Sequence, residues 1–204
     1  MLSNNQPRSQ PSLPRDDGWL LPFLPVFREA GTRVLELGCG PGLDAETLCA
    51  HGFSVFAFDR QPLAVAHRNA PAAHLFRADL GLPLPLRDAS FDAALASLSL
   101  HYLPWNETVS AFAEVRRVVR PGGPFLFRVN ATDDVHHGAG QGIQIEPNFY
   151  TSAPGSWAKT KRFFDEATVR EALGVRFRVE HLAHRTTLRY ESPKQIWECL
   201  ARAV

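Results

Sequence analysis

The stretch Val34-Leu35-Glu36-Leu37-Gly38-Cys39-Gly40-Pro41-Gly42 decides the fold class of this chain. It begins as a short apolar run and ends in glycines, directly before residues 43–50, for which we expect a helix. A buried strand that turns into a helix has this pattern, because glycine permits both the unusual dihedral angles of the turn and the close approach of a ligand. Ligands of open α/β sheets bind beyond the carboxyl ends of the strands. We therefore expect a ligand site at these glycines.

Strands and helices alternate on both sides of this turn. The pattern predicts strands over residues 32–37, 54–58, 74–78, 91–97, 124–129 and 176–184, and helices over 22–30, 43–50, 62–69, 106–119 and 164–173. Such alternation indicates parallel βαβ units, and strands that are apolar on both faces indicate a sheet covered by helices on both sides. The predicted fold class is α/β, with a doubly wound and mostly parallel sheet.

Two segments of the last third are harder to interpret. Residues 131–161 have no hydrophobic period and are rich in Gly, His and Asn, which predicts a long functional loop. At the C-terminal end, Ser192-Pro193-Lys194-Gln195 has the pattern of a capping box that opens a helix. Residues 196–203 could instead form a final strand, and the local pattern leaves both alternatives open.

The composition is that of an ordinary globular domain with a nearly balanced charge. The chain has 204 residues and a formal net charge of +1. We expect a single domain over residues 16–204, preceded by a disordered tail over residues 1–15 that is rich in Ser, Asn, Gln and Pro. The small net charge argues against a nucleic-acid partner, and no apolar run approaches the length of a membrane span.

Cysteine and histidine usage bear on the compartment and on metal binding. The three cysteines lie far apart and form no Cys-x-x-Cys pair, which argues against a disulfide framework or a zinc site. We therefore expect a reducing compartment, the cytoplasm. The Asp and His residues of 133–137 match no tetrahedral ligand spacing, so we expect no metal.

The glycine turn favours one type of ligand. A nicotinamide-binding turn needs Gly-x-Gly-x-x-Gly to seat a pyrophosphate, whereas here Gly42 comes one residue too early and Leu43 stands where that pattern needs glycine. A carboxylate at Glu36 would repel a pyrophosphate but could accept a hydrogen bond from an ammonium group. S-adenosylmethionine offers an ammonium, a sulfonium and no phosphate.

Two further carboxylates follow the next strands. Asp59 ends the second strand about 20 residues after the glycines, where a carboxylate can accept hydrogen bonds from ribose hydroxyls. Asp79 follows the third strand in Arg77-Ala78-Asp79-Leu80, where it could accept the adenine amino group while Leu80 packs on the ring. The structural alternatives are a helix N-cap for Asp59 and an ordinary turn residue for Asp79.

In this order the motifs resemble the class I S-adenosylmethionine-dependent methyltransferases. The resemblance covers roughly residues 30–130 and rests on Glu-x-Gly-x-Gly-x-Gly, the acid after the second strand, Ala-Asp-Leu, Phe91-Asp92, and Arg120-Pro121-Gly122-Gly123. It implies a seven-stranded sheet with an antiparallel last strand, which favours a strand over residues 196–203. It also implies S-adenosylmethionine as cofactor. The implied binding residues are Glu36, Gly38, Cys39, Gly40, Gly42 and Ser97 for the methionine part, Asp59 and Arg60 for the ribose, and Ala78, Asp79 and Leu80 for the adenine.

Methyl transfer mainly requires proximity and in-line orientation, and a general base is needed only when the acceptor has a proton to lose. His101 could be that base, or a buried structural histidine. Glu146 could bind an amine acceptor, or merely cap a turn.

Residues 145–150 followed by 161–164 resemble small methyltransferases of the tellurite-resistance or thiopurine type, which implies a small-molecule acceptor. Two rival functions stay open: a nicotinamide-dependent oxidoreductase, and a module that binds S-adenosylmethionine without catalysis.

Overall fold

The computed structural model of the protein describes residues 18–153 and 158–204. Its centre is a seven-stranded sheet with the strand order β3-β2-β1-β4-β5-β10-β9. The strands of this sheet are β1 (Arg33–Leu37), β2 (Ser54–Asp59), β3 (His74–Arg77), β4 (Ala93–Ser97), β5 (Pro124–Asn130), β9 (Phe177–Thr187) and β10 (Lys194–Ala203). The chain runs outward from β1 in both directions, which is the doubly wound topology predicted above.

The pairing confirms both the parallel core and the antiparallel last strand. β1 pairs in parallel with β2 and β4, whereas β10 lies antiparallel between β5 and β9. The capping-box interpretation of residues 192–195 is therefore wrong, because Lys194 and Gln195 already belong to β10. Both neighbours of β10 supply ladder hydrogen bonds, and alternate residues such as Cys199 and Ala201 are buried under the helices. These hydrogen bonds and contacts stabilise the strand more than a capping box would stabilise a helix at this place.

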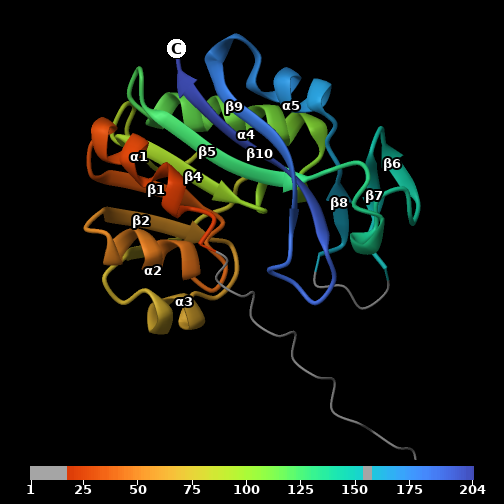
Figure 1. Cartoon of the computed structure of the whole chain (residues 1–204), viewed down its shortest axis with the longest axis horizontal. Coiled ribbons are helices and arrows are strands. Elements are labelled where there is room, and N and C mark those ends of the chain that lie inside the picture. Colours follow the sequence, from red (N-terminus) through yellow and green to blue (C-terminus); the bar gives the residue numbers. More distant parts are fainter. Residues whose placement is uncertain (1–17, 154–157) are drawn as a thin grey trace, which may run out of the picture.

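Helices cover both faces of the sheet (Figure 1). The face with α4 and α5 contains a large aromatic cluster around Phe112, Phe125 and Phe127. The opposite face is packed against α1, α2 and α3. The helix bounds are α1 (Leu24–Ala30), α2 (Leu43–Ala50), α3 (Ala64–Asn69), α4 (Trp105–Val118) and α5 (Glu166–Leu173). Within the described part of the chain, no helix has the length and apolar character needed to cross a lipid bilayer.

The prediction of one long loop over residues 131–161 is wrong. The segment contains a 3-10 turn (Val135–His137) and two strands, β6 (Gln144–Glu146) and β7 (Phe149–Thr151), which form a three-stranded antiparallel sheet with β8 (Thr160–Arg162). Strands of three residues are too short to produce a detectable period. Figure 1 shows this small sheet beside the carboxyl end of β5. The predicted disordered tail over residues 1–15 lies outside the described residues.

Asp92 explains one of the sequence motifs in structural terms. Its Oδ2 accepts hydrogen bonds from the backbone N–H groups of Thr32 and Arg33, both at 2.9 Å, and its Oδ1 lies 2.9 Å from Nη1 of Arg120. A Cβ on Gly31 would lie 2.1 Å from the same Oδ2, so glycine is required there. Asp92 thus links the start of β1 to the turn after α4, which carries Arg120.

We predict that Asp92→Ala lowers the free energy of unfolding by about 1–3 kcal/mol, because two backbone donors and one guanidinium lose their acceptor. Asp88→Ala is the matched control. Asp88 also pairs with an arginine, Arg117, but its side chain is 78% exposed, so the loss should stay within about 0.5 kcal/mol. Urea denaturation of both variants measures the difference. Equal losses would show that Asp92 does not organise the start of the sheet.

Candidate functional site

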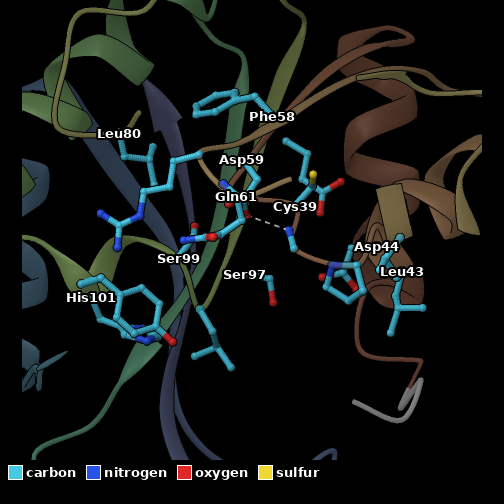
Figure 2. Close-up of a pocket in the computed structure, with 18 of the residues that line it drawn as sticks. Cys39, Leu43, Asp44, Phe58, Asp59, Gln61, Leu80, Ser97, Ser99 and His101 are labelled. Atoms are coloured by element: carbon cyan, nitrogen blue, oxygen red, sulfur yellow. Dashed lines mark hydrogen bonds between the residues drawn. The ribbon is translucent and has the colours of Figure 1, made fainter. Parts of the chain in front are cut away.

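A cleft of about 600 Å³ lies at the carboxyl ends of the first four strands. It is bordered by the glycine turn after β1, by the turns after β2 and β3, and by the 3-10 turn Leu100–Tyr102 after β4. Most predicted binding residues line it (Figure 2). These are Glu36, Gly38, Cys39, Gly40, Asp59, Arg60, Ala78, Asp79, Leu80, Ser97 and, from the acceptor candidates, His101.

The three glycines of the turn have different tasks. All three have positive φ angles, of 69°, 51° and 81° for Gly38, Gly40 and Gly42. A Cβ on Gly38 would lie 2.4 Å from Cβ of Ser99, whereas a Cβ on Gly40 would meet nothing within 4 Å. Gly42 is not among the residues that line the cleft. A Cβ there would lie 3.1 Å from the backbone of Ala66, so Gly42 serves the packing of α2 against α3 rather than a ligand.

Glu36 is a buried carboxylate at the floor of the cleft. It is 2% exposed, and its Oε2 has no hydrogen-bond partner among the described residues. Burial raises the pKa of Glu36 well above its ordinary value, and the nearby Asp44 adds to the effect, while Arg189 opposes it. A buried carboxylate without a partner is costly unless a cation or donor reaches it. This orphaned oxygen fits the ammonium group of S-adenosylmethionine.

Asp59 stabilises the glycine turn from the neighbouring strand. Its Oδ2 accepts from the backbone N–H of Gly40 at 3.0 Å, and its Oδ1 accepts from the N–H of Gln61 at 2.8 Å (Figure 2). The alternative that Asp59 caps the next helix is wrong, because the N-cap of α3 is Leu63 and carries no side-chain cap. Asp59 therefore faces the cleft at the end of β2.

Asp79 is a turn residue that also lines the cleft. Its Oδ1 accepts from the backbone N–H of Gly81 at 3.0 Å, as a turn aspartate does, and the same residue lines the cleft beside Leu80. The two interpretations are compatible because a carboxylate has acceptor sites to spare.

Ser97 is held by a buried arginine that sequence reasoning missed. Arg128 is 1% exposed and donates to Oγ of Ser97 from Nη2 at 2.8 Å. Its guanidinium lies 3.6 Å from the ring centre of Trp19, whose Nε1 donates to Oδ1 of Asp44 at 3.1 Å. The segment before α1 is thereby fixed to the cleft wall.

The connection between β9 and β10 reaches over to the same wall. Nη1 of Arg189 lies 3.1 Å from Oδ1 of Asp44, and both side chains are almost fully buried. Arg189 and Asp44 line the cleft, as does Tyr190. Sequence reasoning missed these residues, since nothing near Arg189 in the sequence marks it as a partner of a residue 145 positions away.

His101 lies at the other end of the cleft, far from Asp44 in Figure 2. It is 1% exposed, and its Nδ1 is buried without a hydrogen-bond partner among the described residues. Burial lowers the pKa of His101 well below its ordinary value, and the positive charges of Lys194 and Lys161 lower it further. The imidazole is therefore neutral at physiological pH. Its ring packs on Tyr102, with centroids 4.1 Å apart.

Glu146 is not brought to the cleft, so the prediction that it contacts the acceptor is not supported by its position. It is absent from the lining residues; its Oε2 forms an ion pair with Arg162 and accepts from the backbone N–H of Trp105 at 2.9 Å. A carboxylate engaged by a buried guanidinium is held in place as a structural group. Glu146 joins the small sheet to the start of α4.

Two lysines that sequence reasoning missed line the cleft near His101. They are Lys161 on β8 and Lys194 at the start of β10. Their rarity could have drawn attention to them, because the chain contains only three lysines against many arginines. Nothing in the sequence shows that two of these three come together.

Both aspartates of residues 133–137 pair with other side chains. Asp134 pairs with Lys194, and Asp133 lies 2.9 Å from Nε2 of His184. Across residues 18–153 and 158–204, no group of three or more His, Cys, Asp and Glu side chains is arranged to hold a metal ion.

Comparisons with known proteins bear on the family. Residues 35–127 match the family model of a methyltransferase domain. A malonyl-[acyl-carrier protein] O-methyltransferase of Enterobacter lignolyticus is 36% identical over 119 residues, which cover 57% of this chain and 45% of that protein. An uncharacterized methyltransferase of Mycobacterium bovis is 36% identical over 132 residues, which cover 62% and 49%. The chain thus spans about half the length of the curated relatives it matches.

Solved structures agree with the fold. An S-adenosylmethionine-dependent methyltransferase from Mesorhizobium loti superposes with a TM-score of 0.67 at 24% identity, covering 88% of this chain and 97% of that one. The 1,6-didemethyltoxoflavin-N1-methyltransferase of Burkholderia thailandensis gives a TM-score of 0.68 at 20% identity, with 93% and 80% covered. The matching model and the sequence relatives identify residues 35–127 as a methyltransferase domain, and the fold is the one shared with S-adenosylmethionine-dependent methyltransferases.

Proposed function

We propose that the protein transfers a methyl group from S-adenosylmethionine to a small-molecule acceptor. The observation that carries the proposal is the buried, unpartnered carboxylate of Glu36 beside a glycine turn at the carboxyl ends of the strands. A dinucleotide would bring phosphate charge to the same place, where Glu36, Asp44 and Asp59 would oppose it. A cationic cofactor relieves that cost instead.

The residues of the cleft suit the parts of this cofactor. Glu36 would accept from the ammonium group, Asp59 from the ribose hydroxyls and Asp79 from the adenine amino group, with Leu80 against the ring. The bound cofactor supplies an already activated methyl group on its sulfonium, so the chain has to bind, orient and exclude water. The ion pair of Asp44 with Arg189 closes the wall beside this site and helps to exclude water.

Several observations support a small acceptor and a cytoplasmic location. The cleft volume of about 600 Å³ falls in the range of small-molecule sites. The net charge of +1 offers little to a nucleic acid. All three cysteines are free thiols, as expected in a reducing compartment. The matched proteins differ in the atom that they methylate, which is an oxygen in one name and a nitrogen in another. The proposal therefore assigns no methylated atom to this protein.

The proposal predicts that S-adenosylhomocysteine raises the melting temperature of the full chain. At a ligand concentration 100 times the dissociation constant, binding adds about 2.7 kcal/mol to the free energy of unfolding. Differential scanning fluorimetry with S-adenosylhomocysteine, and separately with NAD and NADP, measures the effect. A shift with the nicotinamide cofactors alone would favour the oxidoreductase alternative. Cofactor binding without methyl transfer to any of a broad acceptor panel would favour the non-catalytic module.

A further inference from the structure

The charges of the cleft are separated between its two ends. The glycine end carries the carboxylates of Glu36, Asp44, Asp59 and Asp79, which outnumber the guanidinium groups of Arg60 and Arg189 there, and Asp44 is paired with Arg189. The end near His101 carries instead the ammonium groups of Lys161 and Lys194. A negative end suits a cationic cofactor, and a positive end then suits an acceptor of the opposite charge.

Lys161 has spare hydrogen-bonding capacity in this cleft. Its Nζ donates to the backbone carbonyl of His137 at 3.3 Å and forms no ion pair with any described residue. An ammonium group has three donors, so two remain for a ligand. Burial lowers the pKa of the Lys161 side chain, which means that its charge is poorly solvated and would gain from an anion.

Lys194 is anchored next to it. It is 6% exposed, and its Nζ lies 2.8 Å from Oδ2 of the fully buried Asp134. Oδ1 of Asp134 accepts from the backbone N–H of Gln195, so the carboxylate is fixed in place. Its charge lowers the cost of placing Lys194 in the wall of the cleft.

The sum of charges at this end is that of a site for one anion. Lys161 and Lys194 contribute two positive charges and Asp134 contributes one negative charge. His101 and His137 both have lowered pKa values, because burial and the lysines disfavour their charged forms. The cluster therefore has a net charge of about +1, which a singly charged carboxylate neutralises and a phosphate dianion exceeds.

We propose that Lys161 and Lys194 bind a carboxylate group of the methyl acceptor, so that the substrate is a small carboxylic acid held as its anion. This inference rests on the proposed function and names the substrate class of that site. The carboxylate is the group by which the acceptor is positioned against the methyl donor. An uncharged analogue of the same shape leaves both ammonium groups of the cluster without a new partner.

The experiment compares acids with their amides in the presence of saturating S-adenosylhomocysteine. The probes are the matched pairs benzoate and benzamide, and butyrate and butyramide, with inorganic phosphate as a third anion. Dissociation constants come from ligand-observed NMR titration. We expect each acid to bind at least about 10-fold more tightly than its amide and more tightly than phosphate, because charge-assisted hydrogen bonds are stronger than hydrogen bonds between neutral groups.

Variants then assign the effect to the lysines. Lys161→Met should remove most of the preference for acids, whereas Lys161→Arg should retain it because the charge is kept. Lys159→Met is the control, since Lys159 is exposed and lies outside the cleft. Lys161 is the residue to substitute, because it forms no ion pair with a described residue and its loss leaves no buried charge unpaired. Lys194→Met, in contrast, would leave Asp134 buried without its partner, which would destabilise the fold.

Each outcome decides one of the two proposals. If S-adenosylhomocysteine binds but acids and amides bind equally, or if Lys161→Met keeps the preference, the carboxylate site is refuted while the proposed function stands. Tighter binding of phosphate than of either acid also refutes the carboxylate site. Absence of S-adenosylhomocysteine binding to the unmodified chain refutes the proposed function itself.

Discussion

Gly40→Val should reduce the affinity for S-adenosylhomocysteine by at least about 100-fold, or about 2.7 kcal/mol. Gly40 lines the cleft with a φ of 51°, and a Cβ there meets no protein atom within 4 Å. A valine side chain would therefore occupy space at the ligand site rather than in the core. It would also strain the turn, since β-branched residues rarely adopt positive φ. Isothermal titration calorimetry measures the affinity.

Gly122→Val is the matched control for backbone strain. Gly122 has a φ of 77°, and a Cβ there likewise meets nothing within 4 Å, but it lies in the turn before β5 and outside the cleft. Both variants should lose a similar amount of stability, about 1–3 kcal/mol, while only Gly40→Val loses affinity. If both variants bind the ligand as well as the parent chain, the cofactor site has been placed wrongly.

Glu36→Gln should weaken S-adenosylhomocysteine binding by roughly 10- to 100-fold, because a hydrogen bond to a charged group contributes about 1.5–3 kcal/mol. The glutamine keeps the shape of the side chain but lacks the charge that an ammonium group would meet. Glu198→Gln is the control: Glu198 is also a nearly buried carboxylate on a strand of the same sheet, but it does not line the cleft. Equal affinities of Glu36→Gln and the parent chain would remove Glu36 from the site.

The same substitution has a predictable effect on the pH dependence of stability without ligand. The raised pKa of Glu36 means that the folded state keeps this proton to a higher pH than the unfolded state does. The unfolded state therefore holds fewer protons above its own carboxyl pKa of about 4.3, and the free energy of unfolding falls as pH rises from there through the folded pKa. Glu36→Gln lacks this loss, so it should be more stable than the parent at pH 7 and equal to it below pH of about 4. Denaturation at several pH values checks the sign.

Much of the fold was predictable because its signals are local. Apolar runs mark β1, β2, β4 and β5, and the glycine turn after β1 marks where the cleft lies. The glycine end of the cleft follows from the same rule, since the carboxyl ends of neighbouring parallel strands meet at one edge of the sheet. Glu36, Asp59 and Asp79 therefore come together as expected.

The end of the cleft near His101 was not predictable, because its lysines come from segments without a local signal. Lys161 lies on a strand of three residues, and Lys194 belongs to a strand whose first residues have the pattern of a helix start. Glu146 was a candidate for binding an amine acceptor, but its partner Arg162 lies 16 positions further along the chain. Contacts between segments far apart in the sequence decide these positions.

Asp44 joins parts of the chain that are synthesised at very different times. Its Oδ1 accepts from Trp19, 25 positions earlier, and from Arg189, 145 positions later. Closing so long a loop is costly before the intervening sheet exists, which makes such contacts late events in folding. A nascent chain released before residue 189 would already contain the glycine turn, but it would lack both this ion pair and β10, which joins β5 to β9.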